Sequence, residues 1–242
     1  MESKNLKVGV VGLGMVGANR KRWFEMRGYE RGGNLFLSDP PKGFCDDLNQ
    51  TDVLFISVAP PKNSPQGSTI KIMEEIIQDI TKDLWVVVNS TIPIGSTLAL
   101  QKKFSMHTFF FNPEFLWEPT AWENTVNPER QIVAPAIKSQ ETRKMAEQIL
   151  SILPRASLYM SPSQDTFLSS TQAENVKLWT NFYIAQQIMF SNSVFEACEL
   201  DIREFDPVMA ALITDERISP SHLLNPEHGN YRGFGGRCLI KD

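Results

Sequence analysis

Short apolar runs alternate with amphipathic stretches through the first two thirds of the chain. The runs are rich in Val, Ile, Leu and Phe, which is typical of strands buried on both faces of a sheet. Predicted strands cover residues 6–11, 35–38, 53–59, 85–89, 108–111, 131–134 and 157–159, and predicted helices cover residues 16–27, 69–81, 96–104 and 140–150. This alternation predicts an α/β fold with a Rossmann-type, doubly wound and mostly parallel sheet.

The pattern changes after Pro162. Residues 165–200 contain neither Gly nor Pro and place apolar side chains on more than one helical face, which predicts one long helix. Its own sheet domain or a second subunit would bury it. A shorter helix is expected at 206–213. We therefore expect a sheet domain over 1–160 and a helical central region over 161–242.

Composition narrows the classes of partner. A net charge of -4 and a pI of about 5.5 give no broad positive field, so neither nucleic acid nor a membrane is an expected partner. The first residues lack the pattern of a signal peptide, and no apolar run approaches the roughly 20 residues that span a bilayer. A cytoplasmic location is expected.

A glycine motif follows the first predicted strand and opens the first predicted helix. Glycines in this context allow a tight turn and bring backbone N–H groups close to a pyrophosphate. Asp39 lies 22 residues beyond the last glycine. A carboxylate at this position can accept hydrogen bonds from the ribose hydroxyls and would repel a 2'-phosphate, which favours NAD over NADP. The alternative is a turn that only permits packing. The expected NAD contacts are Gly12, Gly14, Met15, Val16, Gly17 and Asp39.

Basic residues at 20–22 are interpreted as a solvated helix face and not as phosphate ligands. The three cysteines are too few and too irregularly spaced for a disulfide framework or a zinc ribbon. Cys238 follows a run of glycines, and on residues alone it is interpreted as an incidental thiol in a turn. Cys45 and Cys198 are weaker candidates. His107, His222 and His228 form no metal-ligand spacing with the cysteines, so no metal is expected.

Four further motifs occur in order. They are GFGGRCLIKD at 233–242, NPEFL at 112–116 with PERQIV at 128–133, STIPIGST at 90–97, and AENVK at 173–177 with Asn181. Together with the glycine motif they resemble the UDP-glucose/GDP-mannose dehydrogenase family over essentially the whole chain.

The resemblance implies a four-electron oxidation. Members of this family oxidise the C6 alcohol of a nucleotide sugar to a carboxylate with two NAD and no metal, and Cys238 would carry the thiohemiacetal and the thioester. Val58 and Thr91 complete the expected NAD contacts. The helix at 165–200 would form a homodimer interface.

The same resemblance assigns the remaining catalytic roles. Lys177 and Asn181, four residues apart on one helix, would stabilise the oxygen that gains negative charge. Asp242 and Thr91 would hold a proton-accepting water, and Glu114 would assist thioester hydrolysis.

Three departures keep alternatives open. The segment between Asp39 and Val53 is short for the family, and residues 228–232 differ from its usual approach to the cysteine. The given sequence ends at residue 242, where members of the family are expected to continue into a second α/β domain. That last departure leaves four alternatives: the chain binds nucleotide sugar weakly, uses a smaller substrate, needs a partner chain, or is a fragment of a longer protein. A catalytically silent NAD-binding interaction module and a two-electron dehydrogenase of the 3-hydroxy-acid type are the competing functions.

Overall fold

The computed structural model describes residues 6–59, 64, 67–220, 223, 227–228 and 231–232 of the 242-residue chain. The chain divides into two compact units, residues 1–177 and 178–242. The domain boundary that the sequence places at residue 160 stays a prediction. No helix in the described ranges is long and apolar enough to cross a membrane.

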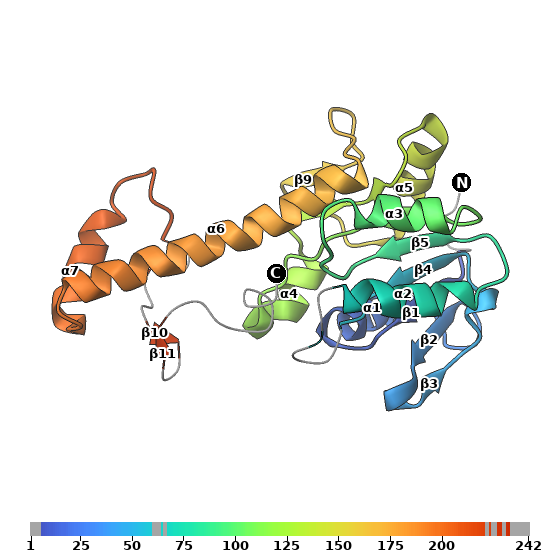
Figure 1. Cartoon of the computed structure of the whole chain (residues 1–242), viewed down its shortest axis with the longest axis horizontal. Helices are drawn as coiled ribbons and strands as arrows, with labels where there is room; N and C mark the ends of the chain where they lie inside the picture. Colours follow the sequence, from blue (N-terminus) through green and yellow to red (C-terminus); the bar gives the residue numbers. More distant parts are fainter. Residues whose placement is uncertain are drawn as a thin grey trace. The chain divides into compact units, whose positions relative to one another are not determined.

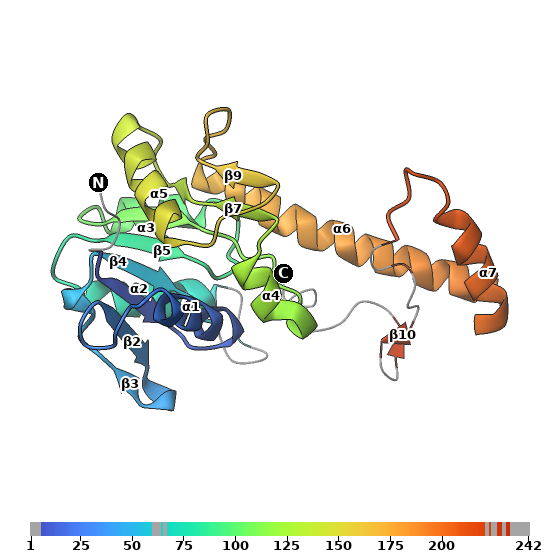
Figure 2. The same cartoon turned by 180° about the vertical axis from the view of Figure 1, so that it is seen from behind.

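A seven-stranded sheet forms the centre of the first unit (Figures 1 and 2). Its strands are β1 (Val8–Val11), β2 (Leu35–Asp39), β3 (Phe44–Cys45), β4 (Val53–Ile56), β5 (Trp85–Val88), β6 (Thr108–Phe111) and β8 (Ala134–Pro135). Their order is β3-β2-β1-β4-β5-β6-β8, in which the five central strands are parallel and the two edge strands antiparallel. This topology confirms the predicted Rossmann-type fold.

The strands of this sheet carry apolar side chains on both of its faces, and helices therefore cover both faces. The helices of the first unit are α1 (Met15–Met26), α2 (Ser68–Gln78), α3 (Ser96–Lys103), α4 (Ala121–Val126), α5 (Gln140–Ile152) and the start of α6 (Ser170–Ala197), with short 3-10 turns η2 (Pro40–Lys42), η3 (Leu48–Gln50) and η4 (Glu118–Thr120). Residues of α1 and α5 share one apolar cluster, and residues of α2, α3 and α6 share the other.

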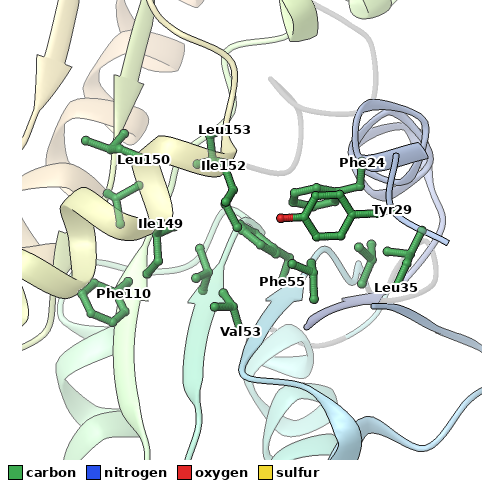
Figure 3. Close-up of a cluster of buried hydrophobic side chains, with 14 of the residues drawn as sticks. Phe24, Tyr29, Leu35, Val53, Phe55, Phe110, Ile149, Leu150, Ile152 and Leu153 are labelled. Atoms are coloured by element: carbon green, nitrogen blue, oxygen red, sulfur yellow. The ribbon is translucent and has the colours of Figure 1, made fainter. Parts of the chain in front are cut away.

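Aromatic side chains anchor α1 to the sheet (Figure 3). The ring of Phe24 lies 5.1 Å from that of Tyr29 and 5.5 Å from that of Phe55, measured between centroids. Ile149 and Ile152 of α5 belong to the same buried cluster. These contacts fix α1, and with it the turn that precedes it, against the parallel strands.

The predicted strand at 131–134 is wrong as a single element. The structure divides it into β7 (Arg130–Ile132), which pairs in parallel with β9 (Tyr159–Ser161), and β8, which pairs with β6 in the main sheet. Val133 lies between them, and its N–H donates to the Ser161 carbonyl oxygen at 2.7 Å. The chain therefore changes sheets inside one apolar run, which a hydropathy pattern does not reveal.

The second unit contains most of α6, followed by α7 (Ile202–Leu212) and the short strands β10 (Glu227–His228) and β11 (Tyr231–Arg232). Phe195, Phe205, Met209 and Leu223 form its core. The long helix is confirmed. The following helix begins four residues earlier than predicted, because the Asp201 carboxylate accepts the Arg203 N–H at 2.8 Å and caps its N-terminus.

Candidate functional site

The glycine turn between β1 and α1 lies at the carboxyl edge of the sheet. Gly12 has a φ of +77°, a backbone conformation that residues with a side chain rarely adopt. A Cβ atom on Gly17 would lie 1.9 Å from the Gly12 carbonyl oxygen, so that position also requires glycine. A Cβ on Gly14 would instead meet no atom within 4 Å. Met15 and Val16 continue into the first turn of α1, which contains no acidic residue. The turn therefore offers space and helix N–H groups to an anionic ligand.

Asp39 contacts this turn from the end of β2. Its Oδ2 atom accepts a 2.7 Å hydrogen bond from the Leu13 N–H and lies 3.7 Å from the Nζ atom of Lys42. The Lys42 ammonium also donates to the Leu13 carbonyl oxygen. The carboxylate expected to bind ribose is thus held beside the turn, and it helps to fix the backbone of the turn.

Val58 and Thr91 follow β4 and β5 and are half-buried. The Cγ1 atom of Val58 would lie 3.1 Å from a Cβ on Gly12, so Val58 packs against the glycine turn. Ser90 Oγ donates to the Val58 carbonyl oxygen at 2.6 Å and joins the two segments. The cofactor candidates therefore gather where the strand order reverses, the usual ligand position in open α/β sheets.

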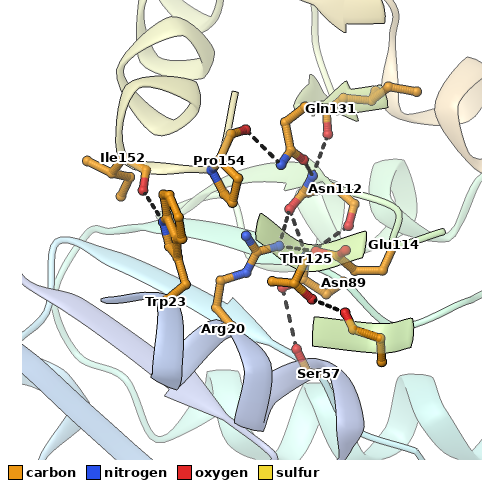
Figure 4. A network of polar contacts seen from close by, with 12 residues as sticks. Arg20, Trp23, Ser57, Asn89, Asn112, Glu114, Thr125, Gln131, Ile152 and Pro154 are labelled. Atoms are coloured by element: carbon orange, nitrogen blue, oxygen red, sulfur yellow. Dashed lines mark hydrogen bonds and ion pairs between the residues drawn. The ribbon is translucent and has the colours of Figure 1, made fainter. Parts of the chain in front are cut away.

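A buried polar network centred on Asn112 follows β6 (Figure 4). The Oδ1 atom of this fully buried side chain accepts from Arg20 Nη2 at 3.0 Å and from Asn89 Nδ2 at 2.9 Å. Its Nδ2 atom donates to Gln131 Oε1 at 2.8 Å and to the Ile132 carbonyl oxygen at 2.7 Å. The network ties α1 to the ends of β5 and β6 and to β7.

Glu114 lies two residues beyond Asn112 and forms an ion pair with Arg20. Burial raises the pKa of its carboxyl group, while the charges of Arg20 and Lys177 act to lower that pKa. The Nζ atom of Lys177 lies 5.4 Å from the centroid of the Phe115 ring. An acid and two cations therefore meet next to the carboxyl edge, in an environment that can tune a general base.

Glu174 fixes the start of α6. Its buried carboxylate accepts the Gly95 N–H at 2.5 Å, the Thr97 N–H at 2.9 Å and the Thr97 hydroxyl at 2.6 Å. These donors belong to the N-terminus of α3, where a carboxylate is favoured by the helix dipole. Lys177 follows three residues later on the same helix, so this contact sets its position.

Lys177 and Asn181 are both buried and lie one helical turn apart on α6. Asn181 belongs to the second unit. Cys238 and Asp242 lie outside the described residues. Among the described residues, Cys45 is exposed and Cys198 packs against the core of the second unit, and no group of three potential ligands could hold a metal.

The interpretation of Arg20 as part of a solvated face is wrong. Its side chain is 1% exposed and lies over the ring of Phe55 at 5.2 Å. The helical spacing already contained a signal, because Gly17, Arg20 and Phe24 fall on one face of α1, and the other two face the core. The sequence contains no local sign of which acid pairs with this guanidinium.

Two family profiles match the chain. Residues 32–153 match the NAD binding domain of the UDP-glucose/GDP-mannose dehydrogenase family, and residues 171–242 match the central domain of that family. The first match begins after the glycine turn, so the turn is evidence independent of it.

Individual proteins agree with these profiles. UDP-glucose 6-dehydrogenase of Campylobacter jejuni is 30% identical over 166 residues, which cover 69% of this chain and 39% of the relative. UDP-glucose 6-dehydrogenase of Gallus gallus is 28% identical, and the match covers 88% of this chain and 44% of the relative. A UDP-glucose dehydrogenase structure from Pyrobaculum islandicum has a TM-score of 0.72 at 23% identity, covering 99% of this chain and 62% of its own. GDP-mannose dehydrogenase from Pseudomonas aeruginosa has a TM-score of 0.65 at 20% identity, covering 98% and 62%. The chain thus spans less than half the length of these two curated relatives.

Proposed function

The chain belongs to the UDP-glucose/GDP-mannose dehydrogenase family, and on that premise we propose that it oxidises the C6 alcohol of a nucleotide sugar to a carboxylate. One observation carries the proposal: a glycine turn with room for an anion follows β1, and the half-buried Glu114, which is paired with the buried Arg20 of α1, follows β6. Because β1 and β6 belong to the parallel part of one sheet, the turn and Glu114 lie at the same edge. A dehydrogenase that also hydrolyses a covalent intermediate requires a cofactor site and a group that activates water, and these two features are candidates for those roles.

NAD binding is supported by the shape of the turn. The open space at Gly14 and the N–H groups at the start of α1 would receive the pyrophosphate. Asp39 would accept hydrogen bonds from the ribose hydroxyls and repel a 2'-phosphate. Val58 and Thr91 would line the same site. When bound, NAD supplies the capacity to accept a hydride from the sugar carbon.

Cys238 would act as the covalent catalyst after the first oxidation has produced an aldehyde. Its sulfur bonds to the aldehyde carbon, and the carbonyl oxygen takes up a proton, giving a thiohemiacetal. Loss of a hydride and a proton gives a thioester. Water then breaks the carbon–sulfur bond, releasing the carboxylate and returning the thiol. The full reaction consumes one water and two hydride acceptors per sugar.

The other candidates would act on oxygen atoms. Lys177 and Asn181 would stabilise negative charge on the C6 oxygen, because residues four apart in a helix face the same direction. Glu114 would accept a proton from the water that attacks the thioester. Thr91 and Asp242 would hold the water that receives the proton of the alcohol.

A homodimer through α6 is the proposed assembly. Phe182, Tyr183 and Phe190 of the second unit are 54%, 60% and 46% exposed, and the last two lie seven residues apart on one helical face. A second copy of the chain would remove this apolar surface from water. A cytoplasmic location is part of the same proposal.

The test is a count of NADH formed per sugar consumed. The full chain is incubated with NAD and UDP-glucose, GDP-mannose or an N-acetylated UDP-sugar, and Cys238→Ser serves as the matched control. Two NADH per sugar with the natural chain, and no carboxylate with the variant, are expected.

Other outcomes select the competing functions. NAD binding without reduction by any of these sugars contradicts the proposal and supports an interaction module. One NADH per substrate that persists after alkylation of Cys238 indicates a two-electron dehydrogenase.

A further inference from the structure

Arg20 is a charged side chain at a core position of α1. It follows Gly17 and precedes Phe24 on the buried face, and its guanidinium lies over the Phe55 ring. Removing a guanidinium from water is costly unless its N–H groups are paired. Its Nε atom has no hydrogen-bond partner among the described residues. The contacts of Nη2 therefore offset the cost of removing this guanidinium from water.

The Nη2 atom bridges two acceptors of different character. One is the Asn112 Oδ1 atom at 3.0 Å, and the other is the Glu114 carboxylate. Asn112 is held by further hydrogen bonds to Asn89 and Gln131. Glu114 belongs to an irregular segment between β6 and η4. Arg20 therefore connects a carboxylate on an irregular segment to a buried, hydrogen-bonded framework.

We propose that Arg20 is a positioning residue for Glu114: its guanidinium, itself held by Asn112, fixes the Glu114 carboxylate so that this group can accept a proton from water. The inference rests on the proposed function, in which this carboxylate takes a proton from the water that attacks the Cys238 thioester. The oxygen of that water bonds to the carbonyl carbon, the carbon–sulfur bond breaks, and the proton on Glu114 returns to the departing thiolate. A protonated Glu114 could not begin this step.

The electrostatic balance at Glu114 supports this role. Burial raises its pKa, and the charged groups that oppose burial are Arg20 from α1 and Lys177 from α6. Without Arg20, Lys177 alone would oppose burial, and Glu114 would keep its proton to higher pH.

The primary test is the titration of Glu114 in the full chain. Glutamates are labelled with carbon-13 at the carboxyl group, and the Glu114 signal is assigned by its loss in Glu114→Gln. Arg20→Met is expected to raise the midpoint by about 1–3 pH units, and Arg20→Lys by less than about one unit. An unchanged midpoint in a folded Arg20→Met chain overturns the inference.

A second readout follows the chemistry. In Arg20→Met the acidic limb of the pH profile for carboxylate formation should move upward with the midpoint, and Arg20→Lys should restore most of it. The NAD dissociation constant should stay unchanged. A uniform loss of rate at every pH, with the acidic limb in place, would contradict positioning and indicate a structural role.

Two controls keep the outcome decisive. If Arg20→Met does not fold, Arg20→Gln retains a hydrogen-bond donor and is titrated instead. Arg20→Met/Glu114→Gln removes both charges and should recover the stability lost in the single variant. The titration requires no turnover. A shifted midpoint in a chain that makes no carboxylate would therefore contradict the proposed function while retaining the Arg20–Glu114 coupling.

Discussion

The glycine turn and the Asn112 network follow strands of one sheet, but they are built in opposite ways. The turn depends on backbone geometry within six residues, from the positive φ of Gly12 to the close approach at Gly17. The network depends on side chains that are far apart in sequence, since Arg20 pairs with residues 92 and 94 positions away. Local geometry can be recognised in a sequence, whereas a buried polar network is specified only once the fold brings its members together.

The largest expected effect is on the network, through Asn112→Leu. The apolar side chain would remove the hydrogen bonds that the Asn112 amide makes with Arg20, Asn89 and Gln131. We expect the free energy of unfolding to fall by about 3–5 kcal/mol, measured by urea denaturation, because each unsatisfied buried group carries a large penalty.

Asn127→Leu is the matched control for this prediction. Asn127 is exposed after α4, so its replacement should change the free energy of unfolding by less than about 0.5 kcal/mol. Equal losses in the two variants would show that the network contributes nothing beyond an ordinary surface amide, and the contrast between the two regions would fail.

Glycine substitutions separate shape from ligand binding within the turn. In Gly17→Ala the Cβ clash with the Gly12 carbonyl oxygen should destabilise the fold by about 1–3 kcal/mol. Gly14→Ala, where the added Cβ meets no atom, should keep its stability but weaken NAD binding roughly tenfold. Thermal unfolding and calorimetry with NAD measure the two effects. Full NAD affinity in Gly14→Ala would remove the turn from the cofactor site.

The sheet was predictable because its strands are buried on both faces and follow one another in short apolar runs. Sequence patterns failed where tertiary contacts decide. The run at 131–134 divides between two sheets: its first part, as far as the Val133 N–H, pairs with residues 159–161, and Ala134 pairs with β6.

The polar site shows the same limit. Glu114 was a candidate through a family motif, but its partner Arg20 looked like one of three solvated cations. Only the helical face that Arg20 shares with Gly17 and Phe24 indicates that its side chain is buried, and this face does not indicate which acid Arg20 contacts.

Asp39→Asn tests whether the turn selects the cofactor. The variant loses the charge that would accept ribose hydroxyls, and Lys42 would lose its nearby anion. We expect NAD affinity to fall about tenfold and the preference for NAD over NADP to narrow, since a charge-assisted hydrogen bond contributes about 1.5–3 kcal/mol. Asp165→Asn, an exposed carboxylate, is the control of equal charge change. An unaltered NAD to NADP ratio in calorimetry would assign Asp39 only to holding the Leu13 backbone.

The smallest expected effect is a pH dependence of stability that arises in the network. Because burial raises the pKa of Glu114 above its ordinary value of 4.5, the folded chain keeps this proton longer than the unfolded chain. Its contribution to stability is therefore complete below pH 4.5 and is lost as the pH rises through the folded pKa. His107, at the opposite end of β6, acts in the other sense. Burial lowers its pKa below 6.5, so its contribution is lost as the pH falls below that value.

Two variants separate these opposing slopes. Glu114→Gln should remove the decline in stability above pH 4.5, and His107→Gln should remove the decline below pH 6.5, each by at most about 1.4 kcal/mol per pH unit. Urea denaturation at a series of pH values measures both, with the doubly substituted chain as the reference. If Glu114→Gln follows the natural chain at every pH, its carboxyl group titrates alike in the folded and unfolded states. The network would then fix the position of Glu114 without tuning its charge, and a tuned general base beside the turn would lose its physical basis.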